Sequence, residues 1–125
     1  MDAPGFIPSL IGAPLSPAGG AVAGTVEDVL LDPASHRPVW LLVRLRDEAP
    51  PYTFVPAQRM ASRADAVVVP FDETAMRHAP VRLAAPAACR PEDAAALGRH
   101  YGVPVPSGEA RPLHAAPARV SRVAA

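Results

Sequence analysis

The sequence predicts a mainly β (α+β) domain in which the strands come first and two short helices follow. Two observations support this fold class. Up to Phe71, short apolar runs alternate with turn residues about every 8 to 15 positions, which is typical of β-structure. Beyond Phe71 the spacing of the apolar residues becomes helical. Half of the 125 residues are hydrophobic, which is enough apolar material for one small core.

The first strands are expected in the N-terminal quarter of the chain. One begins at Leu10, and residues 14–22 are a candidate for a further strand. The next strand covers residues 25–31. Its apolar residues do not keep a single period-two phase, so the adjacent Glu27 and Asp28 predict a β-bulge or kink.

A hairpin leads into the strand that we expect to be central. Asp32 opens the turn over residues 32–37 as part of an Asp-Pro pair. Residues 39–45 are almost continuously apolar, which predicts the most buried strand. Trp40, the only tryptophan, is expected in the core or as a lid, and stacking on a ligand is the alternative. Gly24 is interpreted as a turn residue ahead of the preceding strand.

Two shorter strands follow the central one. Residues 52–55 form the first, which stops at Pro56, and residues 66–69 form the second, which stops at Pro70. Because proline cannot donate a backbone hydrogen bond to a neighbouring strand, both prolines mark strand ends.

Two helices are predicted after the strands. Asp72 is a suitable N-cap for a short helix that ends near His78. Pro91 suits the first position of a second helix, which runs to about Tyr101. Gly102 is its C-terminal stop, because glycine readily adopts the left-handed conformation that ends helices.

These elements divide the chain into four parts. Residues 1–9 are expected to be a flexible lead-in, residues 10–71 the β-domain and residues 72–103 a helical extension. Residues 104–125 contain Pro, Ala and Arg without periodicity, and this composition predicts a disordered tail.

Four stretches together resemble the PRC-barrel domain family. They read GTVEDVLLDPASHRPVWLLVRL (24–45), YTFVPAQRM (52–60), ADAVVVPFDETAMRHAP (64–80) and PEDAAALGRHYG (91–102). The last resembles a short helix found in some stand-alone bacterial members. No single stretch is specific, and the resemblance rests on their order. Members in ribosome maturation carry an extra N-terminal β-domain, and photosynthetic reaction-centre members carry an N-terminal membrane helix, so neither role transfers by default.

The resemblance implies a small, strongly bent β-barrel of five to six strands. Its interior would be filled by side chains such as Val26, Leu42 and Val69. Two positions depart from the family pattern. His36 stands where glycine is common, and histidine tolerates the left-handed conformation there. Ala57 stands where many members have an aromatic residue, so one packing contact is expected to be lost.

The sequence contains no arrangement typical of a catalytic or metal site, so we expect no enzyme, cofactor or metal. Cys89 lacks a recognisable oxyanion loop and is expected to be a buried or incidental thiol. The histidines do not have the short spacing of metal ligands. They are His36, His78, His100 and His114. No apolar run approaches the roughly 20 residues that span a bilayer, and the N-terminus does not resemble a signal peptide, so the expected location is the cytoplasm.

The formal net charge of zero hides an uneven distribution. Residues 1–73 carry five arginines and nine carboxylates, and residues 74–125 carry seven arginines and three carboxylates, which gives −4 and +4. One interpretation is two solvated faces of opposite bias. The other is a basic surface that binds an acidic partner, such as a second copy of the chain. Its candidate residues are Arg77, Arg82, Arg90 and Arg99.

The sequence therefore favours a non-enzymatic adaptor or interaction module that binds another protein and self-associates as a homodimer. The alternative is an accessory factor for RNA or the ribosome. It would use C-terminal arginines, namely Arg111, Arg119 and Arg122, to contact phosphates. A small-molecule sensor is a second alternative, although a barrel this small leaves little internal cavity. Membrane partners are not expected.

Overall fold

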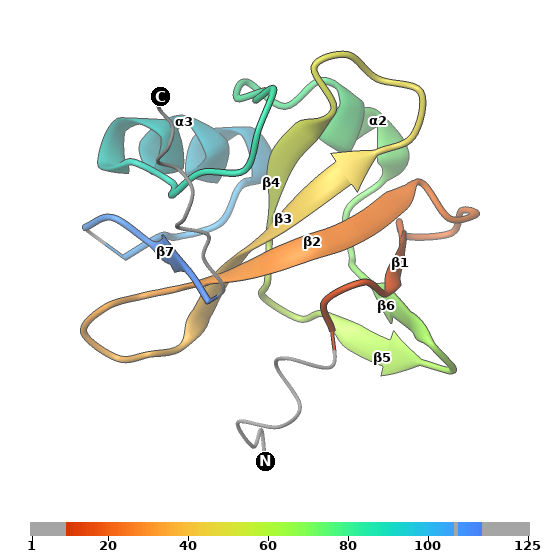
Figure 1. Ribbon diagram of the computed structural model, residues 1–125, viewed down its shortest axis with the longest axis horizontal. Helices are drawn as coiled ribbons and strands as arrows, with labels where there is room; N and C mark the ends of the chain where they lie inside the picture. The colour runs from red at the N-terminus through yellow and green to blue at the C-terminus, as the bar shows by residue number, and fades with distance from the viewer. Residues whose placement is uncertain (1–9, 107, 114–125) are drawn as a thin grey trace.

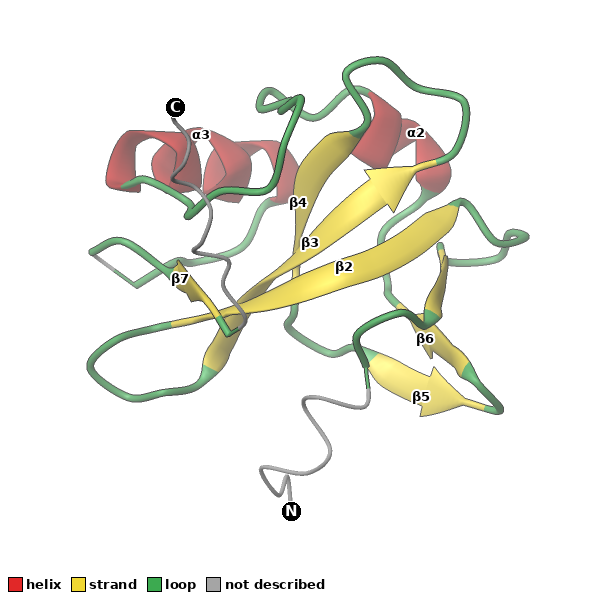
Figure 2. Cartoon of the chain, viewed as in Figure 1, coloured by secondary structure: helices red, strands yellow, loops and turns green. Residues whose placement is uncertain are grey.

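The computed structural model describes residues 10–106 and 108–113. Seven strands form one sheet, in which six follow the order β4-β3-β2-β1-β6-β5 and β7 pairs with β2 (Figures 1 and 2). Two helices accompany it, α2 (Glu73–Arg77) and α3 (Pro91–Tyr101). The predicted fold class, mainly β with two short helices, is confirmed. The strands are β1 (Pro14–Ser16), β2 (Gly24–Leu31), β3 (Pro38–Leu45), β4 (Tyr52–Pro56), β5 (Ala61–Arg63), β6 (Ala66–Val68) and β7 (Arg111–Pro112).

The expected closure into a barrel is not found among the described residues, where the order of the six strands runs open from β4 to β5. The segment that follows α2 pairs with part of the free edge of β4. Tyr52 pairs with Leu83, with backbone N–H···O distances of 3.0 and 2.8 Å. The chain beyond α2 therefore satisfies backbone groups that a closing strand would otherwise take.

The predicted bulge in β2 is confirmed. Val26 is paired with Val43 and Asp28 with Leu42, so the register shifts between Val26 and Asp28. The extra residue returns Val29 to the same side of the sheet as Val26, although the two lie three positions apart. This explains why the apolar residues of β2 do not keep one phase.

Side chains of β3 are buried on both faces of the sheet, which accounts for its continuous apolar run. Leu41 and Val43 lie in one cluster of buried residues, and Trp40 and Leu42 lie in another. Burial of Trp40 in the core is confirmed, with 1% of its surface exposed. Leu42 was expected to fill the barrel interior, and this is wrong, because alternation along the strand directs it to the opposite face.

The inner cluster, which packs between the barrel strands and α2, comprises Leu10, Leu15, Ala23, Val26, Val29, Leu41, Val43, Leu45, Val55, Ala57, Val67, Val69 and Met76. The outer cluster, which joins β2, β3 and β4 to the chain beyond α2, comprises Leu30, Trp40, Leu42, Phe54, Val81, Cys89, Ala94, Leu97 and Ala110. In Figure 1, α3 and β7 lie on one side of the three long strands, and β1, β5 and β6 lie on the other.

The first strand begins later than predicted. Leu10 is buried, but it belongs to a turn, and β1 begins at Pro14, within the range 14–22 proposed for a further strand. The short strand β5 was not predicted. All three of its residues are exposed, so it lacks the apolar alternation that identifies a half-buried strand.

Both helices have the predicted ends. Asp72 caps α2, and its carboxylate accepts a hydrogen bond of 2.8 Å from the backbone N–H of Ala75. Pro91 occupies the first turn of α3. Gly102 ends this helix in the left-handed conformation, with φ of 71°.

The prediction of disorder from residue 104 onwards is wrong for the part that the structure describes. β7 pairs antiparallel with the end of β2, and Cys89 forms a bridge with Ala110. These contacts are not visible in the sequence, because a two-residue strand has no periodicity and its partners lie far along the chain. The expected lead-in (1–9) and the rest of the tail (114–125) lie outside the described residues.

Candidate functional site

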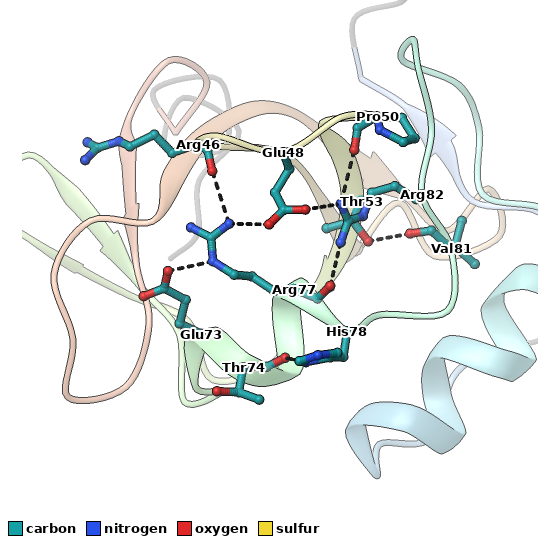
Figure 3. A network of polar contacts seen from close by, with 10 residues as sticks. All are labelled: Arg46, Glu48, Pro50, Thr53, Glu73, Thr74, Arg77, His78, Val81 and Arg82. Carbon is teal, nitrogen blue, oxygen red and sulfur yellow. Dashed lines mark hydrogen bonds and ion pairs between the residues drawn. The ribbon is translucent and has the colours of Figure 1, made fainter.

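Glu48, in the loop between β3 and β4, binds two of the arginines that the sequence singled out (Figure 3). Its Oε2 lies 2.6 Å from Nη1 of Arg77, and its Oε1 lies 2.8 Å from Nη1 of Arg82. All three side chains are partly exposed, with 27%, 26% and 19% of their surfaces accessible. One carboxylate thus joins the β3–β4 loop to α2 and to the segment that follows it.

The two guanidinium groups make further contacts that hold them in place. Arg77 also donates to Glu73 at 2.7 Å and to the backbone carbonyl of Arg46 at 3.1 Å. Arg82 donates to the carbonyls of Pro50 and Arg77 at 3.1 and 2.6 Å. These charge-assisted contacts occupy both arginines within the molecule.

The network shifts the ionisation of its members. Hydrogen bonds from Arg82 and then from Arg77 hold the pKa of the Glu48 carboxyl below its ordinary value. Glu73 and Glu48 in turn raise the pKa of Arg77. The network is therefore stable in its ionised form, with one carboxylate between two cations.

Replacing Glu48 with glutamine should change how stability depends on pH. Because folding lowers the pKa of Glu48, its ionised form stabilises the fold above the unfolded value of about 4.5, and this contribution is lost as pH falls below it. The wild type should therefore exceed Glu48→Gln in urea midpoint at pH 7, and the gap should narrow below about pH 5.

The matched control is Asp47→Asn, because Asp47 is exposed in the same loop and no described residue forms an ion pair with it. Its urea midpoint at pH 7 should lie close to that of the wild type. A gap between wild type and Glu48→Gln that stays constant from pH 7 to pH 3 would contradict the role given to the charge.

The four predicted partner-binding arginines do not form one free surface. Arg77 and Arg82 are occupied by Glu48. Arg90 pairs with Glu92 at 3.1 Å at the start of α3, and both side chains are mostly exposed. Arg99 is exposed, and no described residue forms an ion pair with it.

The structural residues singled out in the β2–β3 region have definable roles. The interpretation of Gly24 as a turn residue is wrong, because it is the first residue of β2 and pairs with Leu45 of β3. A Cβ atom there would come within 2.4 Å of the carbonyl oxygen of Arg44. Asp32 accepts hydrogen bonds from the backbone N–H and the hydroxyl of Ser35, at 3.2 and 2.8 Å. His36 has φ of 61°, so the expectation that it adopts the left-handed conformation is confirmed. Pro56 ends β4, where it is buried and paired with Trp40.

Tyr101, at the end of α3, contacts both hydrophobic clusters. Its ring meets that of Phe71 edge-on, with centroids 5.0 Å apart, and burial raises the pKa of its hydroxyl. Both rings are half-buried. The pair therefore connects the end of the last barrel strand to the helical extension and presents aromatic surface beside it.

Two adjoining hollows lie next to this aromatic pair, and we call them together the Gln58 groove. The first, of about 340 Å³, is bounded by Asp32, Ser35, residues 37–40, Pro56, Gln58 and residues 103–106. The second, of about 270 Å³, is bounded by residues 58–59, 70–71 and 101–104. Gln58 lines both hollows, and its side-chain amide donates to the carbonyl of Pro104 at 3.1 Å.

Each hollow is lined by one arginine that has no counter-ion among the described residues. Arg37 lines the first and Arg59 lines the second. Both are exposed, and neither forms an ion pair with a described residue. Arg59 has φ of 62°, a conformation that is uncommon for residues other than glycine. The groove therefore combines apolar walls with two available guanidinium groups.

Residues 103–106, which line one side of the groove, pack directly against α3. The backbone N–H of Val103 donates to the carbonyl of Gly98 at 3.0 Å. A Cβ atom at Gly98 would lie 3.0 Å from the carbonyl oxygen of Val103 and 3.3 Å from a methyl group of Val105. The absence of a side chain at Gly98 thus sets how closely the wall packs on the helix.

Sequence reasoning did not identify this groove. Its residues come from the β2–β3 hairpin, the end of β4 and the turn after it, the segment between β6 and α2, and the end of α3 with the segment that follows, so no local spacing relates them. The only local signals were the positions of Gln58 and Arg59 after the Val-Pro strand end and the repeated Val-Pro of residues 103–106.

The cysteine and two of the histidines that were considered as catalytic or metal-binding residues are engaged in contacts within the fold. Burial, followed by the charges of Asp93 and Glu109, raises the pKa of the Cys89 thiol to about 12. Ring nitrogens of His78 and His100 lie 3.0 and 2.7 Å from backbone carbonyl oxygens of Thr74 and Ala75. In the described part of the chain, no three His, Cys, Asp or Glu side chains gather in a way that could hold a metal ion.

The remaining candidate residues lie near the C-terminus. His114, Arg119 and Arg122 lie outside the described residues, and Arg111 is exposed on β7. Neither described helix is long and apolar enough to span a membrane.

The family model of the PRC-barrel domain matches residues 6–76, which include β1 to β6 and most of α2. No curated protein matches the chain significantly. The matched region ends before Arg77, so the segment that carries Arg82, Cys89 and α3 lies beyond it.

Proposed function

Since this chain belongs to the PRC-barrel domain family, we propose that it is an interaction module that binds another protein and acts without catalysis. The observation that carries the proposal is the Gln58 groove with its two uncompensated arginines. Aromatic residues and arginine are enriched among the residues that dominate protein–protein binding. Here Tyr101 and Phe71 lie beside Arg59 in one hollow.

The surroundings of Cys89 support binding rather than nucleophilic catalysis. A thiol with a pKa raised to about 12 stays protonated at neutral pH, whereas a nucleophilic cysteine needs a lowered pKa. The thiol also lies in the outer cluster, away from the solvent. We therefore assign Cys89 to packing.

Affinity capture with a matched pair of charge reversals tests the proposal. Arg59→Glu changes the groove, and Arg44→Glu makes the same charge change at an exposed position of β3, outside the groove and outside β5. We expect proteins from cell extract that are retained by wild type and by Arg44→Glu but lost by Arg59→Glu. Equal retention by both variants, or no retained protein, would count against this function.

Nuclease treatment of the extract separates the RNA alternative from this proposal. If retention depends on RNA and on residues 104–125, the accessory role for RNA or the ribosome would replace it, because phosphate contacts by arginine would then carry the binding. Retention that survives nuclease treatment supports a protein partner.

We also propose self-association, through β5 rather than through the basic surface. Arg77 and Arg82 already have internal partners, whereas the residues of β5 are exposed and, in the described structure, this strand pairs only with β6. Antiparallel pairing of two β5 strands would extend the sheet by backbone hydrogen bonds, which depend little on salt.

Sedimentation velocity at low and high salt tests this self-association. We expect the same proportion of dimer at about 0.05 M and about 0.5 M salt, because the screening of charges over this range weakens ion pairs rather than strand pairing. A dimer that dissociates at high salt would indicate an ionic interface, and a monomer under both conditions would contradict self-association.

A further inference from the structure

We propose that the Gln58 groove binds an extended acidic segment of a partner protein, with carboxylates placed on Arg37 and Arg59. This inference rests on the proposed function and adds the chemistry of the partner. It combines the charge of the two arginines with the shape and the lining of the two hollows.

The charge of the groove favours an acidic ligand. Arg37 and Arg59 are exposed in a structure whose more buried arginines, Arg77 and Arg82, already have carboxylate partners. The carboxylate that lines the first hollow, that of Asp32, already accepts two hydrogen bonds from Ser35. A guanidinium group can donate two parallel hydrogen bonds to a carboxylate, so a ligand carboxylate fits each free arginine.

The shape of the groove favours an extended chain over a compact ligand. Gln58, Val103 and Pro104 line both hollows, so a ligand must extend past these residues to contact both arginines. Each hollow has apolar lining next to its arginine. Val39 and Val105 contribute to the first hollow.

The second hollow has the aromatic and proline lining on which extended proline-containing peptides bind. Phe71 and Tyr101 form its edge-to-face pair, and Pro70 lies beside them. Peptides in the polyproline II conformation dock on such aromatic surfaces because their conformation is already ordered before binding. In an alternating proline–glutamate segment, the prolines therefore match the aromatic and apolar lining, and the carboxylates match the two arginines.

Fluorescence anisotropy with a labelled, acetylated proline–glutamate repeat peptide tests the inference on the full chain. The matching peptide carries glutamine in place of glutamate. We expect the acidic peptide to bind about tenfold more tightly than the glutamine peptide, because two exposed ion pairs together contribute about that factor.

Two double variants with the same change in net charge identify the site. Arg37→Gln with Arg59→Gln removes both groove cations, and Arg44→Gln with Arg46→Gln removes two exposed arginines outside the groove and outside β5. The first pair should weaken the acidic peptide about tenfold, and the second should leave it within about twofold. Circular dichroism and the thermal midpoint establish that both variants are folded.

The outcomes separate this inference from the proposed function. Equal binding of the two peptides, or equal loss in both double variants, would overturn the acidic-segment assignment. If the acidic peptide fails while a protein captured from extract still depends on Arg59, the interaction function stands and the ligand chemistry is wrong. A labelled oligouridylate that binds more tightly than the acidic peptide, with the same dependence on Arg37 and Arg59, would assign the groove to nucleic acid.

Discussion

Replacing Gly24 with alanine is expected to lower the free energy of unfolding by about 3 kcal/mol. The added Cβ would lie 2.4 Å from the carbonyl oxygen of Arg44 and 3.2 Å from the Cα of Leu45. Both atoms are backbone atoms of β3, so the clash cannot be relieved by rotating a side chain. β2 and β3 would have to separate where Gly24 pairs with Leu45.

Urea denaturation followed by circular dichroism measures this loss. The control is Thr25→Ala, at the half-exposed position next to Gly24, which should change the free energy of unfolding by less than about 1 kcal/mol. A Gly24→Ala variant as stable as this control would show that the two strands do not approach as closely as the structure indicates.

Replacing Leu97 with alanine is expected to destabilise the whole chain by about 3 kcal/mol. Leu97 is fully buried on α3 and belongs to the outer cluster with Trp40. It lies beyond the part of the chain that matches the PRC-barrel family. If α3 is an integral part of the core, the loss of its main apolar side chain weakens the packing of β3 as well.

Trp40 provides the measurement, because its fluorescence reports directly on the outer cluster. The denaturation midpoint seen by this fluorescence and by circular dichroism should fall together in Leu97→Ala. Arg99→Ala, at an exposed position of the same helix, should remain within about 0.5 kcal/mol of the wild type. A fluorescence midpoint unchanged by Leu97→Ala would show that α3 does not pack on Trp40.

The charge distribution illustrates what the tertiary structure adds to the sequence. Counting residues separates an acidic first part from a basic second part, and it leaves the arginines of the second part as candidates for an external partner. In the folded chain, Glu48 of the acidic part binds Arg77 and Arg82 of the basic part. Part of the apparent polarity is therefore neutralised by contacts within the chain, which join the β3–β4 loop to the helical extension.

The outer cluster illustrates the same point for packing. The apolar run of β3 correctly indicated a buried strand, but not what would cover each face. The covering residues come from α3 and from isolated positions such as Cys89 and Ala110, which have no apolar periodicity of their own. The same lack of local pattern concealed β5 and β7, whose pairing is determined by β6 and β2.

By itself, the sequence determined the features that depend on a few neighbouring residues. These are the strand that is buried along its length, the bulge at Glu27 and Asp28, the left-handed turn at His36 and the ends of both helices, where capping residues satisfy nearby backbone groups. Only the tertiary structure decided the open sheet, the internal use of Arg77 and Arg82, and the Gln58 groove. These features bring together residues that are distant along the chain, and their contacts form only when the strands and the extension pack against one another.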